Sequence, residues 1–251
     1  MPDTQDAAGH VKPYVHDSHN TRALHYSISE IQSRMLIDDP HVLDLDYTRT
    51  MMGFLLFHPQ PRHIAMIGLG GGSLAKFCHR HLPRAQILVV EINPHVIALR
   101  DEFHVPCDDG RFRVVLGDGA QFVRYRSTRA DVLMVDGFDD QGLPSRLCSQ
   151  RFYDDCYEML QPGGILVVNL HFGHVRFDLY LERMRRSFSD NVLVVDDGDG
   201  SNSIVFACKG HRIDLLAERV PQRPKDLDPE AAEQLRASFS RVAAARQHQA
   251  R

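Results

Sequence analysis

Acidic residues stand at the ends of three apolar runs in this sequence. Glu91, Asp118 and Asp136 each close a run rich in Val, Ile or Leu. If these runs are parallel strands, their carboxyl ends meet at one edge of a sheet, where open α/β sheets bind ligands. A crevice lined by carboxylates suits a cation and the hydroxyl and amino groups of a nucleoside. The sequence therefore predicts a nucleoside-binding site at this edge.

A glycine-rich loop precedes the first expected helix of the main domain. Gly68, Gly70 and Gly72 lie in Gly-Leu-Gly-Gly-Gly-Ser, directly after an apolar run. Glycines let the backbone approach a ligand closely and turn sharply into a helix N-terminus. Glu91 follows about twenty residues later, where an acidic side chain can accept both ribose hydroxyls of a nucleotide. We expect these four residues to bind the nucleoside.

Further carboxylates extend the expected site. Asp118 and Gly119 lie where a strand ends and a helix begins, so that the carboxylate or a nearby amide can bind the adenine amine. Asp136 and Asp139 share the next loop, where one of a pair can orient or deprotonate an attacking nitrogen. Taken singly, each carboxylate is equally well explained as a helix cap or a solvated loop charge.

Six apolar runs alternate with helix-like segments across the main part of the chain. The runs occupy residues 63–68, 86–92, 111–118, 131–137, 164–170 and 191–197. Continuous Val/Ile/Leu runs that alternate with helices predict a doubly wound, mostly parallel sheet in a Rossmann-like α/β fold. Residues 203–209 add a seventh strand after only a turn, so this last strand is expected to be antiparallel. That arrangement is typical of the S-adenosylmethionine-dependent methyltransferase fold.

The flanking segments predict four parts. Residues 1–20 are polar and are expected to form a flexible tail, and residues 21–58 a small β-hairpin region and a helix. Residues 59–210 are expected to form a Rossmann-like nucleoside-binding catalytic domain. Residues 211–251 comprise a linker and a C-terminal helix, for which Asp228 is the expected N-cap, with proline in the first helical position. The simplest role for that helix is packing on its own domain or on a neighbouring subunit.

Composition excludes several classes of protein. The 29 basic and 33 acidic residues are mixed and give a net charge of -4, which favours neither a nucleic-acid nor a membrane partner. No apolar run is long enough to span a bilayer, and the N-terminus lacks a secretory pattern. Five scattered cysteines without a CxxC pair and histidines without ligand spacing favour a cytoplasmic protein with no metal site.

The sequence resembles the spermidine synthase (polyamine aminopropyltransferase) family. The most specific element runs from Asp136 through Leu-Pro to Phe152-Tyr153 and on to Pro-Gly-Gly. The stretches that carry the resemblance are residues 67–77, 89–97, 111–123, 131–168 and 203–209. The resemblance implies transfer of an aminopropyl group from decarboxylated S-adenosylmethionine to a small amine such as putrescine, in polyamine biosynthesis. It also implies a homodimer.

The resemblance assigns roles to individual residues. Glu91 would hold the ribose and Asp118 the adenine amine. Asp136 would activate the amine, and Asp139 would contact the diamine. Gln32 is similar to a glutamine that the family places near the donor.

Three departures from the family pattern stand out. Gly71 replaces an aspartate that contacts the amino tail of the donor. Arg49 lies near the position of a tyrosine and is poorly suited to meet a diamine. Asn169 and His171 occupy the place of a glutamine-containing stretch.

These departures leave three hypotheses. The first is an aminopropyltransferase. The second is an S-adenosylmethionine-dependent methyltransferase on the same fold, in which Asn169 or His171 orients a small acceptor. The third is a non-catalytic family member that binds a nucleoside. A change of donor at Gly71 would favour the second hypothesis, because a methionine carboxylate is well received beside a helix N-terminus.

Overall fold

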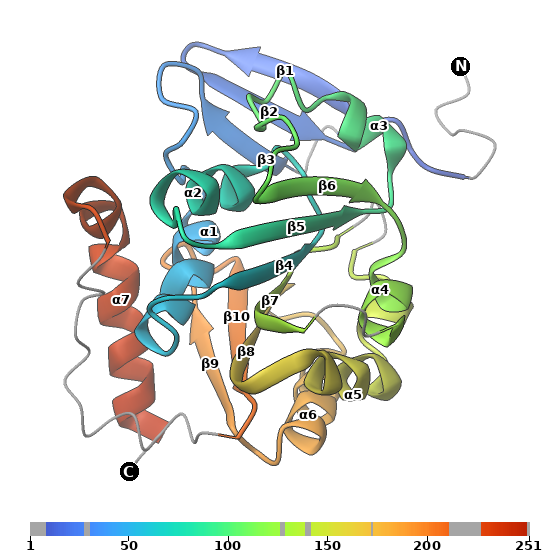
Figure 1. The fold of residues 1–251 in the computed structure, drawn as a ribbon, viewed down its shortest axis with the longest axis vertical. Helices are drawn as coiled ribbons and strands as arrows, with labels where there is room; N and C mark the ends of the chain where they lie inside the picture. The colour runs from blue at the N-terminus through green and yellow to red at the C-terminus, as the bar shows by residue number, and fades with distance from the viewer. Residues whose placement is uncertain are drawn as a thin grey trace.

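The computed structural model describes residues 9–27, 31–125, 129–138, 142–171, 173–210 and 227–249. These residues form one large sheet with helices on both faces and a small sheet beside its edge (Figure 1). Expectations for the linker at residues 211–226 and for Asp139 lie outside the described residues.

The large sheet has the predicted doubly wound topology. Its strand order is β6-β5-β4-β7-β8-β10-β9. The first five of these strands run parallel, whereas β10 is antiparallel to both β8 and β9. The strands are β4 (His63–Ile67), β5 (Gln86–Glu91), β6 (Phe112–Leu116), β7 (Ala130–Val135), β8 (Leu160–His171), β9 (Val192–Asp196) and β10 (Asn202–Cys208). The prediction of a mostly parallel seven-stranded sheet with an antiparallel last strand is therefore confirmed.

Helices cover the two faces of this sheet because its strands are apolar on both sides. On one face lie α4 (Gly119–Tyr125), α5 (Gln150–Met159) and α6 (Phe177–Ser187), which pack in one hydrophobic cluster. The other face carries α2 (Ser73–His81). This helix packs in a second hydrophobic cluster together with residues of the N-terminal region and of the C-terminal helix. The short elements α3 (Pro94–Ala98) and η2 (Ser145–Leu147) lie in connections.

The small sheet contains the expected hairpin, formed by β2 and β3, and one further strand, β1. It consists of β1 (Tyr14–Ser18), β2 (Thr21–His25) and β3 (Ile31–Leu36) in antiparallel order. The expectation of a tail over residues 1–20 is thus wrong for β1, which pairs along its whole length with β2. The polar sequence of this segment suggested a tail, but β1 is a mostly exposed edge strand, and such a strand does not require an apolar run.

The N-terminal helix and the C-terminal helix pack together. The segments α1 (Asp46–Met51) and η1 (Met52–Leu56) contact α7 (Pro229–Gln249) at the side of the large sheet (Figure 1). The Asp228 carboxylate accepts a hydrogen bond from the Ala231 backbone N–H at 2.9 Å, as expected of an N-cap. Leu235 and Val242 are buried against the domain. Among the described residues, no helix is long and apolar enough to cross a membrane.

Candidate active site

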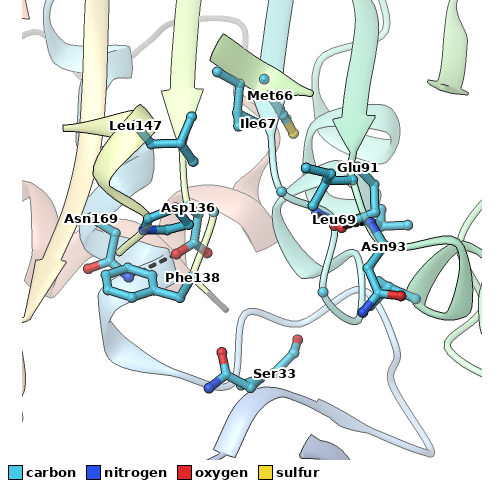
Figure 2. Close-up of a pocket in the computed structure, with 18 of the residues that line it drawn as sticks. Ser33, Met66, Ile67, Leu69, Glu91, Asn93, Asp136, Phe138, Leu147 and Asn169 are labelled. Atoms are coloured by element: carbon cyan, nitrogen blue, oxygen red, sulfur yellow. Dashed lines mark hydrogen bonds between the residues drawn. The ribbon is translucent and has the colours of Figure 1, made fainter. Parts of the chain in front are cut away.

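A cavity of about 590 Å³ opens at the carboxyl edge of the large sheet. It lies between the loops that follow β4, β5, β6 and β7 and the end of β8 on one side and the small sheet and α1 on the other (Figure 2). This volume is in the range of pockets that enclose a drug-sized ligand. The site therefore lies where an open parallel sheet is expected to bind a ligand.

Asp136 follows β7 and projects into this cavity (Figure 2). Its Oδ1 accepts a hydrogen bond from Asn169 Nδ2 at 2.9 Å, and its Oδ2 accepts one from the Tyr47 hydroxyl at 3.2 Å. Burial raises the pKa of the Asp136 carboxyl, and the two hydrogen bonds partly oppose this rise. A carboxylate with both oxygens fixed and a raised pKa is suited to orient an amine and to accept a proton.

Tyr47 is a site residue that the sequence did not reveal. It lies in α1, lines the cavity and reaches Asp136 across 89 residues of sequence. Arg49, which was expected near this position, does not line the cavity. Its guanidinium instead donates to the Asp46 carboxylate and to the Leu43 carbonyl oxygen. Tyr47, two residues before Arg49, is therefore the residue of this segment that reaches Asp136.

Glu91 closes β5 at the other end of the cavity. Its Oε2 accepts the Leu69 backbone N–H at 2.8 Å, and its Oε1 accepts the Asn93 backbone N–H at 2.8 Å. Burial raises the pKa of Glu91, against the effect of these amide hydrogen bonds. The carboxylate thus ties the glycine loop to the β5 end, and Glu91 lines the cavity.

Asp118 lines the same cavity at the end of β6, next to Gly119. Its Oδ1 caps α4 by accepting the Ala120 backbone N–H at 2.8 Å, and its Oδ2 binds Arg146 at 2.6 Å. Burial acts in the opposite direction, but these contacts hold the pKa of Asp118 below its ordinary value. Asp118 is therefore both a helix cap and a wall of the cavity.

The glycine loop shows why side chains are excluded there. At Gly68, φ is 94°, and a Cβ atom would lie 2.2 Å from the Asp136 carbonyl oxygen. Gly68 and Gly70 line the cavity. Gly72 adopts a left-handed conformation as the N-cap of α2 and does not line it, so its role is in the turn.

The small sheet supplies the facing wall. Gln32 and Ser33 of β3 both line the cavity. Phe138 and His171 line it as well and contact each other edge to face, with ring centroids 4.4 Å apart. Among the residues that the structure describes, no group of three or more His, Cys, Asp or Glu side chains could hold a metal ion.

The fold and the cavity together define an α/β protein with a nucleoside-sized site whose carboxylates come from successive strand ends. Comparison with known proteins identifies the family. Residues 45–181 match the model of the Spermine/spermidine synthase domain. The chain belongs to this family, and the prediction of a transferase of the spermidine synthase type is confirmed.

Curated relatives agree over most of the chain. A polyamine aminopropyltransferase from Chromobacterium violaceum is 40% identical over 189 residues, which are 75% of this chain and 72% of the relative. A second, from Neisseria meningitidis, is 37% identical over 206 residues, which are 80% of this chain and 78% of the relative. A spermidine synthase in complex with the transition state analogue AdoDATO has the same fold, with a TM-score of 0.59 at 21% identity, covering 94% of this chain and 86% of that one.

Proposed function

We propose that this protein transfers the aminopropyl group of decarboxylated S-adenosylmethionine to a primary amine such as putrescine. The observation that carries this proposal is the partly buried Asp136 carboxylate, which Tyr47 and Asn169 fix at one end of the cavity of about 590 Å³. Membership of the Spermine/spermidine synthase family supports the same reaction.

The donor would lie across the cavity between two ends. At the nucleoside end, Glu91 would bind the ribose hydroxyls, and Asp118 or the Gly119 amide would bind the adenine amine. Gly68 and Gly70 leave the backbone free to approach the donor. This orientation directs the sulfonium towards Asp136, where a carboxylate favours the positive charge.

The reaction follows from the position of Asp136. The acceptor arrives as an ammonium ion, and a proton must leave before its nitrogen can attack. Asp136 accepts this proton, directly or through one water. The nitrogen then bonds to the carbon beside the sulfonium, the C–S bond breaks, and its electron pair neutralises the sulfur. The products are the elongated polyamine and methylthioadenosine.

Asp139 would contact the far amine of the acceptor, and Phe138 and His171 would form the neighbouring wall. Gln32 would contact the donor from β3. The role of Asp139 rests on the resemblance to the family alone, whereas Gln32, Phe138 and His171 also line the cavity.

The direct test supplies the purified protein with decarboxylated S-adenosylmethionine and putrescine and separates the products by chromatography. We expect spermidine and methylthioadenosine in equal amounts. A methylated amine formed from intact S-adenosylmethionine would establish the methyltransferase hypothesis instead. Donor binding without any product would establish the non-catalytic one.

We also propose a homodimer in the cytoplasm. All five cysteines are free thiols, which suits a reducing compartment. The dimer rests on the family resemblance, and light scattering of the purified protein would show twice the mass of one chain.

A further inference from the structure

The C-terminal helix approaches the site from outside the cavity. The structure describes α7 over its whole length, and none of its residues lines the cavity. The helix lies beside α1, which carries Tyr47, at the side of the large sheet (Figure 1). Packing there is close, because a Cβ atom at Gly53 of η1 would lie 2.7 Å from Val242 Cγ2. A displacement of α7 would therefore be passed on to the segment that holds Tyr47.

An ion pair links these two helices. Arg241 of α7 donates through Nη2 to the Asp46 carboxylate, and the same nitrogen donates to the Thr50 hydroxyl at 3.1 Å. Asp46 is 8% exposed and is the first residue of α1, directly before Tyr47. A pair this sheltered is screened less than a surface pair, and removal of one partner leaves a buried charge uncompensated. The contact therefore fixes the first turn of α1.

Asp46 also joins a third element to this pair of helices. Its Oδ2 accepts the Gly198 backbone N–H at 2.5 Å, and its Oδ1 accepts Arg49 Nη2 at 2.9 Å. Gly198 belongs to the turn between β9 and β10, which also contains the cavity-lining Ser201. Burial acts in the opposite direction, but Gly198, Arg49 and Arg241 hold the pKa of Asp46 below its ordinary value. Asp46 is therefore a carboxylate at neutral pH that joins α1, α7 and this turn.

The hydrogen bond that depends on this junction is a long one. The Tyr47 hydroxyl donates to Asp136 Oδ2 at 3.2 Å, which is longer than usual for a hydroxyl donor. A small displacement of Tyr47 away from Asp136 would therefore break it. Asn169 and His171 also act on Asp136, but both belong to β8. The junction at Asp46 can thus reach Asp136 through Tyr47.

We infer that Arg241 is a positioning residue for the reaction: through Asp46 it holds the first turn of α1 so that the Tyr47 hydroxyl reaches Asp136. The inference rests on the proposed function, in which Asp136 accepts a proton from the acceptor amine. It gives the C-terminal helix a part in catalysis without a contact to either substrate.

The test follows the acidic limb of the kcat/KM profile in Arg241→Ala. Loss of the Tyr47 hydrogen bond removes a contact that lowers the pKa of Asp136, so the limb should move to higher pH, as in Tyr47→Phe. Near neutral pH, kcat/KM should fall by about three- to fivefold. This loss is smaller than for Tyr47→Phe, because the hydroxyl is displaced but not removed. A lower melting temperature with an unmoved limb would show a merely structural role and overturn the inference.

A double variant separates positioning of Tyr47 from every other effect of Arg241. In Tyr47→Phe no hydroxyl remains to be positioned. Adding Arg241→Ala to it should therefore lower kcat/KM by no more than about twofold and leave the limb where Tyr47→Phe alone places it. Full additivity of the two substitutions would show that Arg241 acts by another route, which contradicts the inference.

Two further variants serve as controls. Arg241 reaches Asp46 through one nitrogen, so Arg241→Lys can supply a single ammonium in its place and should keep the limb near its wild-type position. Arg236→Ala is the matched control on the same helix, because the ion pair of Arg236 with Glu233 is exposed to solvent. Its profile should match the wild type. No recovery in Arg241→Lys, or an equal shift in Arg236→Ala, would each overturn the inference.

Asp46→Asn provides the same test from the other side of the ion pair if Arg241→Ala does not fold. The amide keeps the shape of the carboxylate but loses the charge that binds Arg241. The acidic limb should again move to higher pH. An unmoved limb in folded Asp46→Asn would contradict the inference.

Failure of the proposed function would be visible earlier. Wild-type protein that transfers no aminopropyl group to putrescine would overturn the proposed function, and this inference with it. Wild-type protein that transfers the group and responds to Tyr47→Phe, but not to Arg241→Ala, would overturn the inference alone.

Discussion

The two ends of the cavity hold their carboxylates in different ways. At the proposed nucleoside end, Glu91 is fixed by the backbone amides of Leu69 and Asn93, which lie in the loops after β4 and β5 of one strand-helix-strand unit. At the catalytic end, Asp136 is fixed by side chains from α1 and β8. A backbone amide donor remains whatever the side chain is, whereas substitution of Tyr47 or Asn169 removes the hydrogen bond to Asp136. Under the proposed function, the first end would bind the donor and the second would carry out the chemistry.

The largest effect is expected for Asp136→Asn. The amide has nearly the shape of the carboxylate but cannot accept a proton, so kcat should fall by about a thousandfold. Steady-state assays with saturating donor and acceptor measure this loss. A fall of less than about tenfold would show that another group accepts the proton.

Glu91→Gln should impair donor binding at the opposite end of the cavity. Losing the charge weakens hydrogen bonds to the ribose and to the loop, so donor affinity should fall by about ten- to a hundredfold. At saturating donor, kcat should stay within about threefold. Unchanged donor affinity by calorimetry would discredit the ribose assignment.

Tyr47→Phe and Asn169→Ala sharpen the comparison at the catalytic end. Each removes a hydrogen bond that lowers the pKa of Asp136, while burial continues to raise it. The pKa of Asp136 should therefore rise, so that the carboxylate becomes protonated at a higher pH than in the wild type. The acidic limb of the kcat/KM profile should shift to higher pH. The rate near neutral pH should fall by about tenfold.

Tyr157→Phe is the control for this shift. Tyr157 lies in α5, away from the cavity lining, and contacts Lys209. Its profile should match the wild type. An unmoved acidic limb in both Tyr47→Phe and Asn169→Ala would show that Asp136 is not the group that titrates.

The smallest effect is expected for Arg146→Ala. Arg146 is half-exposed, and its ion pair with Asp118 lies at the rim of the cavity, where such pairs contribute little. Donor affinity should change by less than about threefold. A tenfold loss would show that Arg146 itself contacts the donor.

The sequence was most informative where structure is local. Glu91 and Asp118 could be predicted because a strand end, a glycine loop and a helix start are adjacent in the chain. The alternation of apolar runs with helical segments predicted the large sheet for the same reason.

Contacts between distant segments could not be predicted in this way. Tyr47 meets Asp136 only because α1 packs at the carboxyl edge of the sheet, and its position in the sequence reads as the start of an apolar helix. The same holds for Ser33, which approaches Gly71 from a separate sheet.

The separation of the two ends is tested most directly by the donor affinity of Asp136→Asn. Calorimetry should give a dissociation constant for decarboxylated S-adenosylmethionine within about tenfold of the wild type, or about 1.4 kcal/mol. That result, together with the loss of turnover, would assign chemistry to Asp136 and binding to the opposite end. Donor binding lost as severely as turnover would contradict this account.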